Sequence, residues 1–184
     1  AVAGAAGLGL LFLLGAAARL ERAPFRLASY RAVRDAEVHL GEVPCDFLAW
    51  EHLNWECATF DRGVHGETGL STSAPLHVAG VERPFFLITT QRGRPRRVRW
   101  ADVPASEALR LRYAVPDEAP RGGGTLRVSV EDEELTRLLL PSPPDGEVHH
   151  AVLDTAAWAG RRVTLELELT GRRAMVLVDG GFAP

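Results

Sequence analysis

The sequence predicts an all-β fold, an antiparallel two-sheet jelly-roll sandwich preceded by an N-terminal transmembrane helix. Three observations predict it: an uncharged apolar run opens the chain, apolar and polar residues alternate in short segments from residue 75 onward, and Gly, Pro or Asp turns separate these segments. With 184 residues, 46% of them hydrophobic, the chain is long enough for one domain with a core. We expect a transmembrane helix at 1–20, a juxtamembrane segment at 21–44 and the sandwich at 45–184.

The opening run, residues 1–18, carries no charged or polar side chain. As a helix rising ~1.5 Å per residue it would reach roughly 27 Å, close to a bilayer core of about 30 Å. The alternative is a signal peptide with its apolar core at 8–14. We favour a membrane helix whose start is missing, because a mature chain would have lost a signal peptide. Small residues four apart would let a membrane-protein partner approach this helix closely, and they are Ala3 with Gly7 and Ala5 with Gly9.

The side of the membrane is predicted from charge and cysteine usage. All 21 basic residues are Arg, a bias typical of a GC-rich bacterial genome, and several of them follow the apolar run, which favours a cytoplasmic flank. Cys45 and Cys57, the only cysteines, lie twelve residues apart, which favours a disulfide in an exported domain; two buried thiols are the alternative. We expect a bacterial, membrane-anchored domain on the periplasmic or extracellular side.

The segment before residue 75 predicts one short helix, around 27–38, and an aromatic cluster beside the cysteines. Trp50 and Trp55 lie there with Phe47 and Phe60. Exposed Trp faces stack on sugar rings, so both tryptophans are candidate binding residues. The alternative is a core packed around a disulfide.

Strands follow one another from residue 75. Residues 163–169 alternate Val or Leu with Thr or Glu, and the turn at 170–173 leads into 174–178, which together predict a hairpin. Residues 109–115 alternate in the same way, with Arg110 and Arg112 toward solvent. Further strands are predicted at 76–81, 85–90, 97–103, 126–130, 135–140 and 148–153.

The late strands carry a family resemblance. A hydrophobic strand ends at the corner residue Asp154, an Ala159-Gly160-Arg161 loop follows, and an alternating strand begins at Val163. This pattern resembles galactose-binding-like jelly rolls over roughly residues 75–184. Such domains are often carbohydrate-binding modules or accessory domains of membrane-anchored bacterial glycan enzymes. Their ligand residues vary, so the resemblance implies a fold and no site.

Motif searches predict no catalytic residue, metal or cofactor. A Gly-x-Ser-x-Gly motif is absent, and a phosphate-binding loop would need the Lys that the chain lacks. The six histidines have no metal-ligand spacing, and the adjacent His149 and His150 would face opposite sides of a strand. The acidic run 131–134 predicts a solvated turn. A net charge of −3 gives no overall electrostatic attraction to nucleic acid, so we expect no nucleic-acid partner.

An arginine cluster spans residues 92–99 and ends at Trp100. Guanidinium groups bind carboxylates, phosphates and sulfates, so the cluster predicts a contact with an anionic glycan or a lipid headgroup. The alternative is a solvated hairpin that turns at Gly93 and Pro95, with Arg97 and Arg99 outward and Trp100 inward. The candidate binding residues are therefore Arg94, Arg97, Arg99, Trp100, Trp50 and Trp55.

The sequence thus predicts a non-catalytic accessory or glycan-binding module at the bacterial envelope. The alternatives are a structural subunit for protein–protein interaction and the terminal domain of a larger polytopic membrane glycan enzyme.

Overall fold

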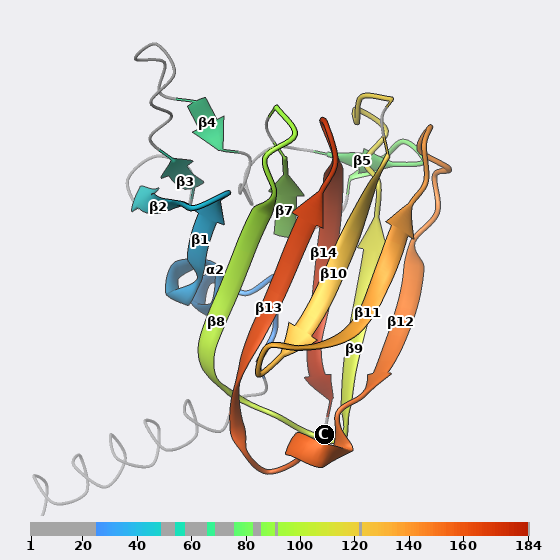
Figure 1. Ribbon diagram of the computed structural model, residues 1–184. Coiled ribbons are helices and arrows are strands. Elements are labelled where there is room, and N and C mark those ends of the chain that lie inside the picture. The colour runs from blue at the N-terminus through green and yellow to red at the C-terminus, as the bar shows by residue number, and fades with distance from the viewer. Residues whose placement is uncertain are drawn as a thin grey trace, which may run out of the picture.

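The computed structural model describes residues 25–48, 54–57, 66–68, 76–82, 86–90, 92–121 and 123–183. Within them the chain forms two antiparallel sheets that pack face to face (Figure 1). The predicted all-β, two-sheet antiparallel sandwich is confirmed.

The strand order gives eight strands to one sheet and four to the other. The eight-stranded sheet runs β11 (Glu133–Leu140), β10 (Gly124–Val130), β13 (Arg162–Thr170), β8 (Arg96–Pro104), β1 (Glu37–Leu40), β2 (Val43–Leu48), β3 (Asn54–Cys57) and β4 (Gly66–Thr68). The four-stranded sheet runs β12 (His149–Asp154), β9 (Ala108–Ala114), β14 (Met175–Ala183) and β7 (Phe86–Thr89). A separate hairpin consists of β5 (His77–Val78) and β6 (Val81–Glu82).

Alternation in the sequence explains which face of each strand is buried. In β13 every second side chain is buried, and the Thr and Glu side chains between them are partly exposed. Its buried side chains pack against those of the other sheet, and the core draws on both layers, for example Val98 and Leu167 from one and Leu109 and Val176 from the other. The predicted strands are found, except that 76–81 contains the turn between β5 and β6.

The segment before β1 belongs to the sandwich. A short helix, α2 (Tyr30–Asp35), lies within the predicted range and is capped by the Ser29 hydroxyl, which accepts from the Ala32 amide at 3.2 Å. Leu27 is fully buried, and β1 pairs with β8. The range 21–44, expected as a juxtamembrane segment, therefore supplies a helix and a strand to the core.

The predicted membrane helix at 1–20, with its small-residue pairs, lies outside the described residues. In the part of the chain that the structure describes, no helix is both long and apolar enough to cross a bilayer.

Two predicted hairpins are wrong, because each pair of consecutive strands is split between the sheets. β13 and β14 lie in opposite layers, and so do β7 and β8, which the arginine-rich loop connects. The two crossover loops lie side by side: the Thr90 amide donates to the Ala174 carbonyl at 2.9 Å, and the Gly93 amide to the Arg172 carbonyl at 3.2 Å. Alternation predicts that each of these strands has one buried face. It does not predict which sheet the strand joins, because strands of both sheets bury a face in the same core.

The outer face of the four-stranded sheet is only partly covered. The β5–β6 hairpin lays Val78 over Leu87 and Leu177, which form a small second core. Two carboxylates from the loop after β9 hold the hairpin: Asp117 accepts from the Gly80 amide at 2.7 Å, and Glu118 contacts the His77 ring at 2.7 Å. No other described element covers the rest of this face.

Candidate functional site

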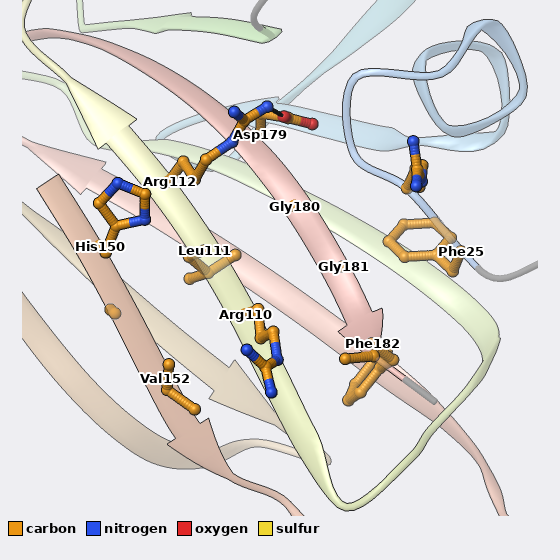
Figure 2. Close-up of a pocket in the computed structure, with 13 residues that line it drawn as sticks. Phe25, Arg110, Leu111, Arg112, His150, Val152, Asp179, Gly180, Gly181 and Phe182 are labelled. Carbon is orange, nitrogen blue, oxygen red and sulfur yellow. Dashed lines mark hydrogen bonds and ion pairs between the residues drawn. The ribbon is translucent and has the colours of Figure 1, made fainter. Parts of the chain in front are cut away.

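A groove occupies the open part of the four-stranded sheet (Figure 2). It crosses β12, β9 and β14 and has a volume of about 400 Å³, within the range of small-ligand sites. The side chains that matter chemically are Phe25, Arg26, Arg110, Arg112, His150, Val152 and Asp179.

Strand register places these side chains in two neighbouring rows. The first row is His150, Arg112 and Asp179, which lie opposite one another on β12, β9 and β14. Residues directly opposite in antiparallel strands have Cβ atoms roughly 5 Å apart, so each row is continuous. The second row, two residues along β9, is Val152, Arg110 and Gly181.

The two groove arginines of β9 differ in their surroundings. Arg112 makes an ion pair with Asp179, whose side chain is mostly covered, so the aspartate fixes the direction of that guanidinium (Figure 2). Arg110 is exposed, and among the described residues no carboxylate forms an ion pair with it. Of these two arginines, Arg110 is therefore the more available to a ligand.

Two glycines of β14 let the N-terminal segment close one side of the groove. The Leu27 amide donates to the Gly180 carbonyl at 2.8 Å. A Cβ at Gly181 would collide with the Phe25 carbonyl oxygen, and one at Gly180 with the Arg110 carbonyl oxygen. Gly180 also has φ +126°, which disfavours any side chain. Gly181 therefore permits the close approach of Phe25 to β14, and Gly180 the close approach of β9.

The arginines predicted from the 92–99 cluster lie elsewhere, on or near the outer face of the eight-stranded sheet. Arg97 and Arg99 alternate outward as expected, but carboxylates surround them. Arg97 lies 3.5 Å from Glu168, and Arg99 lies 3.9 Å from Asp132. Arg94 is exposed in the crossover loop.

Arg96 belongs to the interior and not to a surface cluster. Its guanidinium donates to the Thr89 carbonyl at 3.1 Å and to the Cys45 sulfur at 3.3 Å. Loss of hydration on burial lowers the pKa of Arg96 to about 10, so the group stays charged at neutral pH.

Trp100 is wrong as a candidate binding residue, because its side chain is 1% exposed. Its indole N–H donates to the Ala32 carbonyl at 2.6 Å, and its ring lies 5.8 Å from those of Phe25 and Phe86. Trp50 and the side chain of Trp55 lie outside the described residues. The backbone of Trp55 pairs with that of Phe47.

Cys45 and Cys57 lie directly opposite each other in β2 and β3. Opposite residues in an antiparallel pair have Cα atoms about 4.5 or 5.5 Å apart, within the range that a disulfide spans. The described residues include no free cysteine. The Cys45–Cys57 disulfide stays a prediction for which the backbone is well placed.

The two adjacent histidines point to opposite sides of β12, as predicted. His150 lines the groove, whereas His149 stacks on Tyr113 with ring centroids 5.1 Å apart. His149 also contacts Asp145 at 2.9 Å, and with Glu147 their ligand atoms lie within 4.8 Å of one another. Burial raises the pKa of Asp145, but hydrogen bonds from the Glu147 amide and His149 outweigh it and lower the pKa overall.

Sequence reasoning missed the groove although its signals were present. Arg110 and Arg112 were predicted to face solvent, but nothing local marks them as neighbours of His150 or Asp179. The Gly180-Gly181 pair inside a strand is the clearer signal, because glycine in a strand often marks a close approach of backbone or ligand.

Searches with family models and among curated proteins find no match to this chain. Among solved structures, one similar chain is described by the words "Structural basis for the promiscuous specificity of the carbohydrate-binding modules from the beta-sandwich super family". The TM-score is 0.39 at 11% sequence identity, with 61% of this chain and 50% of that chain covered. The chain spans half the length of that structure, and the distant likeness concerns the β-sandwich fold alone.

Proposed function

We propose that this chain is a non-catalytic glycan-binding module and that the groove over the four-stranded sheet is its binding site. The observation that carries the proposal is the pair of side-chain rows on that sheet, in which Arg110, Arg112 and His150 lie beside the exposed Val152.

The chemistry of a sugar ring suits this surface. A pyranose presents hydroxyl groups around its edge and C–H groups on its faces, so it needs polar partners and apolar contact together. The guanidinium forks of Arg110 and Arg112 donate several hydrogen bonds in fixed geometry. Val152, 65% exposed, and the ring of Phe25 offer apolar surface in the same groove.

Rigidity also supports the proposal. The binding groups stand on paired strands, and the Asp179 carboxylate restrains Arg112 before any ligand arrives. A restrained side chain loses less conformational entropy on binding, which improves affinity.

We further propose that the module works at the bacterial envelope, membrane-anchored with the sandwich on the periplasmic or extracellular side. The uncharged run at residues 1–18 and the opposed positions of Cys45 and Cys57 support this address.

A structural protein–protein interaction subunit is the second candidate function. Strand β11 lies at one edge of the eight-stranded sheet, and its Leu139 side chain is 79% exposed. An edge strand with an exposed apolar side chain is a surface to which another chain can add.

The test is a glycan array probed with the full chain, followed by calorimetry on each glycan that binds. Arg110→Ser/Arg112→Ser is compared with Arg97→Ser/Arg99→Ser, a control that removes the same charge from the other sheet. We expect the groove variant to lose binding and the control to keep it. Loss in the control alone would move the site to the arginine cluster. Binding of no glycan would refute the proposal and favour the interaction subunit.

A further inference from the structure

We infer that the groove selects an acidic glycan and that Arg110 binds the anionic group of the sugar. This inference rests on the proposed function and names the class of ligand. It follows from the charge of the groove and from the lack, among the described residues, of an acidic neighbour beside Arg110.

The groove is positive although the chain is not. Arg26, Arg110 and Arg112 line it with a single acidic residue, Asp179, which gives a formal charge of +2 with His150 neutral. The whole chain carries −3. A concave surface whose sign is opposite to the net charge attracts ligands of negative charge.

On the eight-stranded sheet, outward-facing arginines lie beside glutamates of a neighbouring strand. Strand β13 sets Glu166 and Glu168 beside the arginines of its neighbours: Arg127 lies 3.0 Å from Glu166, and Arg97 lies 3.5 Å from Glu168. Each of these guanidinium groups has a carboxylate on the adjacent strand. The positive groove is therefore not a general result of the arginine-rich composition.

Arg110 lacks that arrangement on both sides. Its cross-strand neighbours are Val152 on β12 and Gly181 on β14, and neither is acidic. A carboxylate or sulfate from a ligand would take the position that glutamate takes on the other sheet, with two parallel N–H···O bonds from the guanidinium.

Asp179 directs the anion to Arg110. The Asp179 carboxylate already occupies Arg112 and repels a second anion beside it. The neutral part of the sugar then faces Arg112 and His150, which provide polar contacts to its hydroxyl groups.

The experiment uses matched pairs of ligands with the full chain. An oligogalacturonide is compared with its methyl ester, and a sulfated oligogalactan with its unsulfated form, by calorimetry at two salt concentrations. We expect the acidic member of at least one pair to bind more tightly, by about 10- to 100-fold, with an advantage that shrinks as salt is raised. The pair that responds identifies the anion as carboxylate or sulfate.

Arg110→Gln tests the assignment of the residue. We expect it to remove the preference for the acidic ligand, because the affinity for the acidic member should fall by a larger factor than the affinity for the neutral member. The matched control Arg97→Gln should keep the preference, and thermal melting of both variants checks folding. If acidic and neutral members bind equally, or if Arg110→Gln keeps the preference, the inference is wrong while the glycan-binding function stands. If no glycan binds, including the case in which only phosphatidylglycerol vesicles bind, the inference and the proposed function both fail.

Discussion

Replacement of Trp100 by Phe tests whether this residue is a structural anchor. The indole is enclosed between the sheets, and its N–H makes the 2.6 Å hydrogen bond to the Ala32 carbonyl of helix α2. A phenyl ring keeps the aromatic contacts with Phe25 and Phe86 but cannot donate that hydrogen bond. Because phenyl is smaller than indole, the replacement also leaves part of the space of the indole unfilled.

The expected loss follows from these two terms. A buried carbonyl that loses its donor costs about 1 kcal/mol at the lower end of the usual range, and the unfilled space adds roughly 1–2 kcal/mol. The free energy of unfolding should therefore fall by about 2–3 kcal/mol. In a chain of this size that lowers Tm by roughly 4–12 °C. Trp100→Ala should cost more, about 3–5 kcal/mol.

The assay is urea unfolding followed by far-ultraviolet circular dichroism, with Leu139→Ala as the control. Leu139 is 79% exposed, so its truncation should change stability by less than ~0.5 kcal/mol. Glycan binding by Trp100→Phe, measured well below its Tm, should equal that of the unmodified chain, because the indole does not reach the surface. An unchanged free energy of unfolding, or lost binding in folded protein, would refute the assignment of Trp100 to the core.

Two further predictions concern cross-links and pH. Mass spectrometry of the non-reduced protein should find Cys45 and Cys57 in one disulfide-linked peptide. Reduction should lower Tm, since closing this short loop contributes roughly 3 kcal/mol to stability. Two freely alkylated thiols in native protein would contradict the disulfide. The hydrogen bond from His77 holds the pKa of Glu118 below its ordinary 4.5. A carboxyl group whose pKa is lower in the folded state stabilises the fold above pH 4.5. That stability is lost as the pH falls through the pKa of the folded state. Glu118→Gln should therefore lower Tm slightly at pH 7, and the difference should shrink as pH is lowered below 4.5. The exposed Glu133→Gln should change Tm little over the same range. A Tm difference that does not shrink in acid would exclude this account.

Local patterns in the sequence determined most of the strands. The alternation in 163–169 reflects a strand with one buried face, and β13 has its apolar side chains inward. The same rule placed Arg97 and Arg99 outward and Trp100 inward on β8. Side-chain direction repeats every two residues along a strand, so the sequence specifies it without knowledge of the neighbours.

Sheet membership depended on the tertiary structure. The segments 163–169 and 174–178 have the pattern of a hairpin, yet β13 and β14 lie in opposite layers. Strands facing the same core from either sheet bury the same kind of residue. Their pairing partners are decided by long-range contacts, such as that of β13 with β8, and not by the turn between them.

The candidate site shows the same division. The sequence by itself determined that Arg110 and Arg112 face solvent, because they alternate with leucines that are buried. Only the tertiary structure decided what lies beside them: β14 brings Asp179 to Arg112 and Gly181 to Arg110, whereas β13 brings Glu168 to Arg97. The availability of an arginine to a ligand depends on the charges across the neighbouring strands, and those strands are distant in sequence and adjacent only in the folded sheet.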